Sequence, residues 1–571
     1  MTNQDIADIF NEIADILELK NENTFRVLAY RRATRAIENL PEVFSGQKTT
    51  GIGEDLAKKI IEIQKTGHLK FLEKLRRTIA PGLVEMLNIP GLGPKTILKL
   101  NQKFKIKNIS DLEKILSEHK IAQLEGFGKQ SEENIKDGIA QYKRHISRFP
   151  LGKIYPLASN IADELRKVAL VDKVDLAGSI RRMKETIGDI DILCTTKNPS
   201  AVIKKFCLLP NVETVKEKGN TKAVIILKNG LEADLRVLKS ESYGAALHYF
   251  TGNKDHNIKI RSIGAKKGLK INEYGIYKQM ANGKWQIVGG KTEQEVFDAV
   301  GLPYIEPELR EDRGEIEAGF KHELPRLIKL SDIKGDLHIH TNYSDGAESI
   351  EEMARAAIKM GYEYILISDH TTTVGITNGM DEKKILRQMR EIDKINQAFR
   401  GQRLGFRILK GVECDIKSNG SLDLPDKILE KLDLVIGAIH SKFKMDQTER
   451  VIKACQNKNV DIIAHPTGRI IGKRDPYPVN LEKVMDICQK TNTYLELNSF
   501  WNRLDLSDVN CLLARKKKIK IALGTDAHSQ THFPLMKFGV CQARRGWLEK
   551  DDVLNTLKKD KLISTFSAKV H

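Results

Sequence analysis

The C-terminal part of this 571-residue chain alternates short apolar runs with patterns typical of helices. The runs include YILISDH, LVIGAIHS, DIIAHP, YLELNS and IALGTDAH. Strands that alternate with helices pair in parallel, because each helix returns the chain along one face of the sheet. Residues 333–571 are therefore predicted to form repeated β-α units in a parallel sheet or a barrel.

Histidine and acidic residues recur in this part of the chain, and nearly all of them sit at the end of a predicted strand. The C-terminal ends of parallel strands meet at one rim, so side chains that are distant in sequence can form one site. A single histidine is usually a core or hydrogen-bonding residue, but so many at strand ends favour a metal centre. Mixed imidazole and carboxylate ligands suit Mn²⁺, Zn²⁺ or Fe²⁺, and nine of them are enough for two or three ions. The nine candidate ligands are His338, His340, Asp345, His370, Glu413, His440, His465, Asp526 and His528.

A second group of acidic residues lies on β-rich runs in residues 146–240, which predict an antiparallel or mixed sheet with helices. Asp189 and Asp191 are two residues apart on a predicted strand, so both side chains leave the same face. Asp234 can join them from a neighbouring strand. A strand-borne Asp-X-Asp can be a solvated face or a turn, but three converging carboxylates would supply the oxygen ligands for two Mg²⁺ ions.

The first part of the chain is predicted to be helical, because apolar residues recur three and four positions apart. It divides into two small domains, residues 1–78 and 79–145. Three glycine pairs, spaced about forty residues apart, lie between the predicted helices: Gly51 with Gly53, Gly91 with Gly93, and Gly126 with Gly128. Each pair suits a tight turn before a helix whose free N–H groups can bind a phosphate. One pair alone is usually a structural turn, whereas repetition in a basic helical region favours the helix-hairpin-helix DNA-binding motif.

The net charge of +18 favours a polyanionic partner such as nucleic acid, although anionic metabolites or membranes can also attract a basic protein. No apolar run is long enough to span a bilayer and no secretory signal is visible. We therefore expect no membrane partner and a cytoplasmic, nucleoid-associated location. The seven cysteines form no CXXC pair, which argues against a disulfide framework and a cysteine zinc site.

The front half of the chain resembles the family X DNA polymerases, the group of DNA polymerase beta. The resemblance lies in GSIRRMKETIGDID, the downstream Asp234, YFTGN at 249–253, INEYG at 271–275 and the leading glycine hairpins. It extends over residues 1 to about 312 in the family's order. It implies an α/β nucleotidyltransferase palm in residues 146–240, followed by a thumb in residues 241–315 that binds the nascent base pair.

The resemblance also implies that the three aspartates hold the catalytic metals. Gly178 and Ser179, just before a cationic pair, can surround a triphosphate with a hydroxyl, backbone amides and guanidinium groups. By resemblance, Ser179, Arg182 and Gly188 contact the incoming triphosphate. Arg236 would hold the second aspartate of the Asp-X-Asp pair in an inactive geometry or release it.

Five further positions match nucleotide and template contacts of the family. Tyr249, Phe250 and Gly252 match the stretch that packs the deoxyribose and excludes a 2′-hydroxyl. The alternative interpretation is that the aromatic residues belong to an ordinary core. Asn257 and Arg261 match contacts to the nascent pair and the template in the minor groove, where shape is read. The alternative interpretation is that Asn257 and Arg261 are ordinary surface residues.

In the first domain, Lys59 aligns with the lysine that forms a Schiff base with an abasic sugar. Tyr30 and Arg26 align with contacts to the nearby 5′-phosphate. The chain departs from the family pattern at Asp55, where the animal enzyme has a lysine. An acid one helical turn before Lys59 stabilises the protonated amine, which argues against lyase activity.

The histidine-rich set resembles the PHP domain, a trinuclear phosphoesterase on a distorted β/α barrel. All nine ligand positions of that family are filled, which favours an active hydrolase over a structural platform. Metal-activated water would attack a phosphodiester. Arg469 and the run Arg515 to Lys518 can hold substrate phosphates or form a solvated surface.

The domain order, with a linker at 316–332, resembles bacterial and archaeal family X polymerases that carry a C-terminal PHP nuclease. It implies a monomeric enzyme of base excision repair that fills gapped or nicked DNA from dNTPs. The same enzyme would trim DNA ends as a 3′-5′ exonuclease. AP endonuclease or 3′-phosphatase activity would be additional. Three alternatives stay open. The PHP domain can be a pyrophosphatase or a structural clamp, the front half can be a nucleotidyltransferase for tRNA or small molecules, or the whole chain can be a DNA-end-binding scaffold. The hairpins, YFTG and INEYG disfavour the second.

Overall fold

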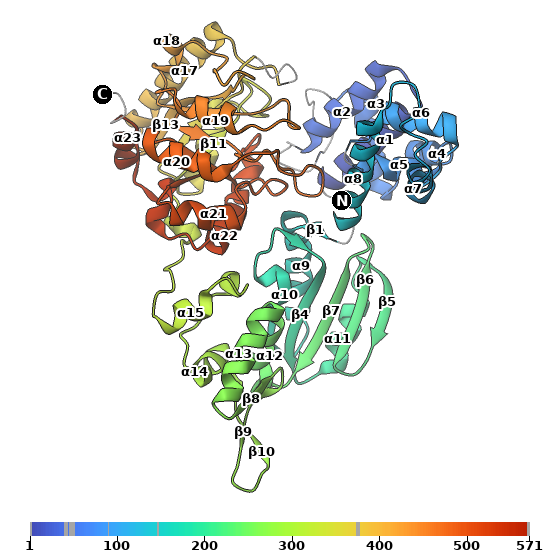
Figure 1. Cartoon of the computed structure of the whole chain (residues 1–571), viewed down its shortest axis with the longest axis vertical. Coiled ribbons are helices and arrows are strands. Elements are labelled where there is room, and N and C mark those ends of the chain that lie inside the picture. The colour runs from blue at the N-terminus through green and yellow to red at the C-terminus, as the bar shows by residue number, and fades with distance from the viewer. Residues whose placement is uncertain are drawn as a thin grey trace.

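The computed structural model describes residues 3–38, 44, 52–89, 91–145, 148–372 and 377–567. They form two helical N-terminal domains, a palm sheet, a thumb and a C-terminal parallel barrel (Figure 1). In the view of Figure 1, the palm lies below both the N-terminal helices and the barrel. The fold class predicted from the sequence is confirmed.

The N-terminal domains are two bundles of amphipathic helices. In the first, Ile6, Phe10 and Ile13 pack with Ile60 and Ile63 in one fully buried core. The helices are α1 (Asn3–Leu19), α2 (Thr24–Glu38), α3 (Glu54–Thr66), α4 (Lys70–Arg76), α5 (Pro81–Glu85), α6 (Pro94–Phe104), α7 (Ile109–Ser117) and α8 (Lys129–His145).

The glycine hairpins lead into helices. The second glycine of each pair is exposed and stands directly before a helix: Gly53 before α3, Gly93 before α6 and Gly128 before α8. Gly91 and Gly126 have φ angles of 85° and 80°, in the left-handed region that favours glycine. Gly51 lies outside the described residues. The first N–H groups of these helices are thus free of helical partners and can bind a phosphate.

The palm is a mixed sheet of five strands in the order β2-β4-β7-β6-β5. Its central pair, β4 and β7, is parallel, and the other pairs are antiparallel. Helices α9 (Leu151–Arg166) and α11 (Pro199–Cys207) bury Ile154, Ile161 and Phe206 in the core of the sheet. The strands are β2 (Val171–Leu176), β4 (Asp189–Thr196), β5 (Val212–Lys218), β6 (Lys222–Leu227) and β7 (Glu232–Leu238). The short α10 (Gly178–Arg181) and the pair β1 (Phe149–Pro150) and β3 (Thr186–Ile187) complete the palm.

The thumb packs helices around a small antiparallel sheet, whose β9-β10 hairpin forms the lower end of the molecule in Figure 1. Its elements are α12 (Tyr243–Thr251), α13 (Lys254–Lys266), β8 (Leu269–Asn272), β9 (Gly275–Gln279), β10 (Trp285–Gly289), α14 (Glu293–Val300) and α15 (Glu315–Phe320). The segment 316–332, for which the sequence predicted a linker, carries most of α15. Its Ile316 and Leu327 lie in the thumb core.

The C-terminal domain is a seven-stranded parallel sheet in sequential order, β11 to β17. An added bridge between Ile339 and Ala527 joins the first strand to the segment after the last, so the sheet nearly closes into a barrel. The strands are β11 (Gly335–Ile339), β12 (Tyr364–Ile367), β13 (Arg407–Asp415), β14 (Leu434–Ala438), β15 (Ile462–Ile463), β16 (Tyr494–Asn498) and β17 (Ile521–Gly524). The helices are α16 (Ile350–Lys359), α17 (Glu382–Gly401), α18 (Asp426–Leu429), α19 (Thr448–Cys455), α20 (Leu481–Thr491), α21 (Asp508–Lys516), α22 (Met536–Arg545) and α23 (Lys559–Ser567).

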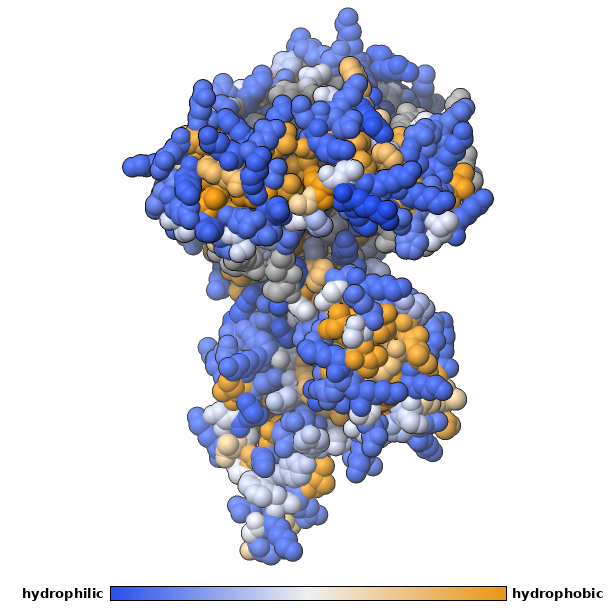
Figure 2. Space-filling view, turned by 90° about the vertical axis from the view of Figure 1, so that its right-hand side faces the viewer, coloured by the Kyte–Doolittle hydropathy of each residue, from blue (hydrophilic) through white to orange (hydrophobic). Residues whose placement is uncertain are grey.

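Hydrophilic side chains extend over the upper, middle and lower parts of the face in Figure 2, with apolar patches between them. Within the described part of the chain, no helix combines the length and apolar character needed to cross a bilayer.

The barrel and the palm share an apolar core. Leu504 and Phe538 of the barrel domain are buried together with the palm residues Leu151 and Ile154. The rings of Phe538 and Tyr155 meet edge to face, with centroids 6.1 Å apart. The two domains are therefore held by packing as well as by the chain that connects them.

We expect Phe538→Ala to destabilise the protein by about 3 kcal/mol, because it removes a buried ring and leaves a cavity between palm and barrel. Urea denaturation followed by tryptophan fluorescence measures the shift. Phe25→Ala is the matched control, since Phe25 is 83% exposed and should leave the midpoint unchanged. Equal midpoints for the two variants would contradict a packed junction.

Candidate active sites

The three palm aspartates lie at one end of the central strand pair. Asp189 and Asp191 begin β4, and Asp234 on β7 is the direct parallel neighbour of Asp191. Residues two apart on one strand and neighbours in register share a face, so the three side chains leave the same side of the sheet. Asp189 is exposed, whereas Asp191 and Asp234 are partly buried.

Gly178 makes room for these carboxylates. Its φ is 58°, and a Cβ at this position would stand 2.1 Å from Oδ2 of Asp191. Only glycine fits such a turn. The hydroxyl of Ser179 follows it, buried and without a hydrogen-bond partner. A cleft of about 400 Å³ opens here, and its lining includes Arg182 and Lys254 besides Ser179 and the first two aspartates. Gly188, another predicted contact, lies between β3 and β4.

The aspartates influence one another electrostatically. Burial, followed by the charges of Asp189 and Asp234, raises the pKa of Asp191 to about 7. Burial also raises the pKa of Asp234, although Arg236 opposes it. A bound cation would relieve this repulsion, and the oxygen ligands suit Mg²⁺. Among the described residues, groups of three or more ligand atoms that all lie within 4.8 Å of one another occur only in the barrel. The carboxylate oxygens of the three palm aspartates therefore do not all lie within this distance of one another.

Two arginines of the palm have partners that the sequence did not predict. Arg236 pairs with Asp234 at 3.4 Å instead of with Asp191, because the two lie two residues apart on the same face of β7. Arg182 is 9% exposed, and its guanidinium donates to Glu311 Oε1 at 2.9 Å and to the carbonyl of Thr251 at 2.7 Å. Arg182 therefore lines the cleft from a fixed position.

Two of the thumb residues expected to contact the nucleotide, Phe250 and Gly252, line the same cleft. Tyr249 and Phe250 are half-buried at the end of α12, with ring centroids 5.2 Å apart. A Cβ on Gly252 would stand 2.5 Å from Oδ1 of Asn257. The amide of Asn257 donates to the carbonyls of Tyr249 and Gly252, at 2.7 and 3.1 Å. Arg261 is exposed one turn further along α13.

The first domain places Lys59 among aromatic rings. Its Nζ lies 6.0 Å from the ring centroid of Tyr30 and 5.4 Å from that of Phe71. The guanidinium carbon of Arg26 lies over the ring of Phe71, 5.3 Å from its centroid. Asp55 forms an ion pair with Lys59, as the sequence led us to expect. This pair occupies the amine that a Schiff base would need.

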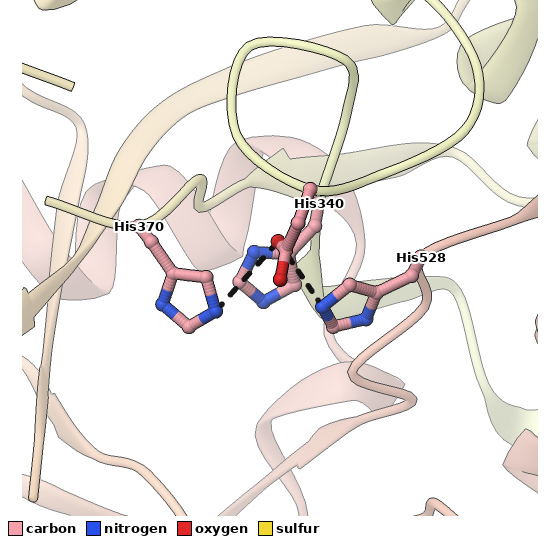
Figure 3. A group of neighbouring side chains, drawn as sticks. His340, His370 and His528 are labelled. Carbon is pink, nitrogen blue, oxygen red and sulfur yellow. Dashed lines mark ion pairs between the residues drawn. The ribbon is translucent and has the colours of Figure 1, made fainter. Parts of the chain in front are cut away.

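All nine histidine and acidic candidates gather at the C-terminal rim of the barrel. Three groups have ligand atoms within 4.8 Å of one another: His340, Asp345, His370 and His528; His338, His340 and Asp526; and His370, Glu413 and His440. His465 joins them through Nε2, 3.0 Å from Glu413 Oε1. The groups share members and so form one continuous centre. Figure 3 shows His340, His370 and His528 turned toward one another. His370 and His528 each form an ion pair with the carboxylate of Asp345.

The crowding of these rings makes their proton affinities unequal. Burial disfavours protonation of His528, but Asp345 and Asp526 outweigh it and raise the pKa of His528 to about 9. Burial and the nearby His528 and His370 lower the pKa of His340 to about 3. Neutral imidazoles and ionised carboxylates are the forms that bind metals. The buried atoms His338 Nε2, Asp345 Oδ1 and Glu413 Oε2 make no hydrogen bond of normal geometry. This donor set fits divalent metal ions.

A supporting layer that the sequence did not single out surrounds the ligands. Nδ1 of His338 lies 2.7 Å from Oε1 of Glu496, and the other oxygen of Glu496 accepts from the N–H of His465 at 2.6 Å. Nδ1 of His440 lies 3.3 Å from Asp415. Such carboxylates fix the orientation of a metal-binding imidazole. Glu496 in YLELNS and Asp415 in GVECD each follow a buried strand residue. This pattern could have identified both acids from the sequence.

Three of the five basic residues that were candidates for substrate phosphates have acidic protein partners. The guanidinium of Arg469 is held by both carboxylate oxygens of Glu185 in the palm, at 3.2 and 2.7 Å. This charge therefore joins two domains. In the basic run, Arg515 pairs with Glu549 at 2.8 Å and Lys517 pairs with Asp486 at 2.6 Å. A different arginine, Arg503, reaches the metal centre, with Nε 3.4 Å from Asp526 Oδ2.

Comparison with protein families places four models along the chain in the order of the observed domains. They are a helix-hairpin-helix domain at residues 1–69, a SAM-like helix-hairpin-helix tandem at 83–141, the DNA polymerase beta thumb at 246–311 and the PHP domain at 336–500.

Curated relatives resemble the whole chain or parts of it. The DNA polymerase/3′-5′ exonuclease PolX of Bacillus subtilis is 39% identical over 97% of this chain and 97% of its own length. A probable phosphatase of Thermoanaerobacter sp. is 35% identical over 39% of this chain and 89% of its own. DNA polymerase lambda of Rattus norvegicus is 25% identical over 50% of this chain and 52% of its own. The full-length similarity and the matched domains show that the chain belongs to the family X DNA polymerases that carry a C-terminal PHP domain.

Proposed function

We propose that this chain is a DNA-directed DNA polymerase that fills short gaps, with a 3′-5′ exonuclease in its barrel domain. The observation that carries the proposal is the register of Asp191 beside Asp234, facing the turn of Gly178 and Ser179. The name of the Bacillus subtilis relative, DNA polymerase/3′-5′ exonuclease PolX, supports both activities.

For synthesis, Asp189, Asp191 and Asp234 are proposed to hold two Mg²⁺ ions. These ions would supply Lewis acidity at the attacking 3′-hydroxyl and at the leaving pyrophosphate. Ser179 would donate its free hydroxyl to a triphosphate oxygen. Arg182, together with Gly178 and Gly188 in the surrounding turns, would hold the same triphosphate through guanidinium and backbone N–H groups.

The thumb is proposed to select the nucleotide. Tyr249 and Phe250 would pack the deoxyribose. Position 252 must be glycine, because Asn257 leaves no room there for a side chain. A sugar in close contact with this stretch would exclude a 2′-hydroxyl by shape. Asn257 and Arg261 would contact the nascent pair and the template from the minor groove.

For hydrolysis, the nine rim residues are proposed to hold two or three Mn²⁺, Zn²⁺ or Fe²⁺ ions, which imidazole-rich sites favour. The ions would supply an activated water and neutralise the phosphate that it attacks. Glu496 and Asp415 would keep the histidine rings in place. Arg503, which reaches Asp526, is available to bind a phosphate oxygen of the DNA strand.

A phosphatase is the second candidate for the barrel. The observation that favours it is the match of this domain to a probable phosphatase over 89% of that protein. A 3′-phosphatase or AP endonuclease would use the same ligands and would clean a blocked 3′ end before synthesis.

Gapped or nicked DNA is the proposed macromolecular substrate. The helix N-termini after Gly53, Gly93 and Gly128 would bind its backbone phosphates. We further propose a monomer that acts in base excision repair in the cytoplasm, at the nucleoid. Lyase activity at Lys59, with Tyr30 and Arg26 as 5′-phosphate contacts, would require Asp55 to release the amine of Lys59. The proposed domain boundaries follow residues 78, 145, 240 and 332, with the segment 316–332 counted as part of the thumb because Ile316 and Leu327 pack in its core.

We expect Asp191→Ala to abolish primer extension alone and His340→Ala to abolish end degradation alone, each by about a hundredfold or more. Each variant removes one ligand from one metal site. Gapped, 5′-phosphorylated DNA with labelled 3′ ends measures both activities, with Mg²⁺ and Mn²⁺ compared. The exposed residues Asp163 and His322 provide matched controls, Asp163→Ala and His322→Ala. If one folded variant lost both activities, the two-site assignment would be wrong.

We expect the Mg²⁺ requirement of extension to rise as the pH falls from 8 to 6. The pKa of Asp191 is raised to about 7, so below this pH the carboxyl is protonated and a proton competes with the ion. The half-saturating Mg²⁺ concentration should increase by roughly tenfold over this range, as expected for one competing proton. Mg²⁺ titrations of extension at each pH provide the measurement. A requirement that is flat over this range would show that Asp191 does not titrate there.

A further inference from the structure

Arg545, near the end of α22 in the barrel domain, is buried at the junction of three domains. It is 2% exposed. Its Nη1 donates to the backbone carbonyl of Arg182 in the palm at 2.7 Å and to Oε1 of Glu311, between α14 and α15 of the thumb, at 3.0 Å. Its Nη2 donates to Asp508 of the barrel domain at 2.6 Å. One guanidinium therefore joins the turn that begins at Gly178 and ends at Arg182, here called the triphosphate turn, to both neighbouring domains.

Glu311 links the two arginines. The same oxygen, Oε1, accepts from Nε of Arg182 at 2.9 Å and from Nη1 of Arg545. Burial alone would raise the pKa of Glu311, but Arg545 and Arg182 outweigh it and lower the pKa to about 2. Glu311 is therefore a charged, buried carboxylate shared by one arginine that lines the cleft and another that belongs to the barrel.

We propose that Arg545 is a positioning residue for nucleotide binding in the palm, acting through Arg182. The proposal rests on the proposed polymerase function, in which Arg182 contacts the triphosphate. Arg545 fixes the turn by its bond to the Arg182 carbonyl and shares Glu311, so that this carboxylate does not draw the Arg182 guanidinium away from the cleft. The barrel domain thereby supplies a part of the polymerase site.

Removal of Arg545 should have two effects on Arg182. The carbonyl loses its buried donor, which loosens the turn. The carboxylate of Glu311 also loses a cation, so its attraction for Arg182 increases at the expense of an incoming triphosphate. Both effects weaken nucleotide binding and leave the three aspartates in place.

The adjacent residue on α22 offers a matched control. Arg544 is a partly buried arginine at the same junction, but its partners are Glu308, Glu306 and the carbonyl of Ile328. It makes no hydrogen bond or ion pair with the palm within the described part of the chain. Arg544→Ala therefore loosens the contact between thumb and barrel without touching the triphosphate turn.

The experiment measures kcat and KM for a dNTP on one-nucleotide gapped DNA with the full chain, and the Kd of the dNTP with a dideoxy-terminated primer. For Arg545→Ala we expect KM and Kd to rise roughly tenfold, as for the loss of one charge-assisted hydrogen bond, with kcat changed less than twofold. Arg545→Lys keeps the charge and should give a smaller rise in a protein that folds. Arg544→Ala should leave both constants unchanged.

A double-variant cycle separates positioning from a general structural role. Arg182→Ala should raise KM, and Arg545→Ala should add little in that background, because its effect passes through Arg182. Additive effects, unchanged constants in folded Arg545→Lys and Arg545→Ala, or an equal rise in Arg544→Ala would each overturn the positioning role. If the unaltered enzyme extends primers in these cases, the proposed function still stands. If it does not extend primers, the proposed function itself fails.

Discussion

Charges that are buried together hold this multidomain chain in one arrangement. A buried ion costs several kcal/mol of desolvation unless opposite charges and hydrogen bonds surround it. Glu311 is surrounded in this way by both neighbouring domains, because its ion-pair partners are Arg182 and Lys184 of the palm and Arg545 of the barrel domain. Glu293 of the thumb is paired in the same way with Arg181 of the palm and with Arg310. The pairing requirement therefore fixes how palm, thumb and barrel meet.

Two kinds of sheet bring two kinds of metal ligand together. In the palm, one parallel pair within a mixed sheet places Asp191 beside Asp234, and a glycine turn leaves space above them. In the barrel, seven parallel strands end at one rim, so ligands from six of the strands and the loops after them reach a common centre, while β16 supplies the supporting Glu496. The first geometry gives a small carboxylate set in an open cleft. The second gives a dense, buried set that is rich in histidine.

Much of both sites could be predicted from sequence, because each ligand type carries a local signal. Asp189 and Asp191 share a strand face by their spacing alone, and His338 and His340 do the same. Partners across domain boundaries carry no such signal. Arg469 looks like a free phosphate ligand in the sequence, but Glu185, far away in the chain, neutralises it. The linker predicted at 316–332 was likewise read from composition, whereas Ile316 and Leu327 pack in the thumb core.

The near closure of the barrel has a consequence for how the protein is made. Its first strand carries His338 and ends directly before His340, and the segment that bridges to it carries Asp526 and His528. The rim centre is therefore incomplete until His528 has been synthesised. The palm aspartates emerge much earlier. A chain whose synthesis stops inside the barrel would lack a complete histidine centre, so the degradative site can form only after the polymerase site has been synthesised.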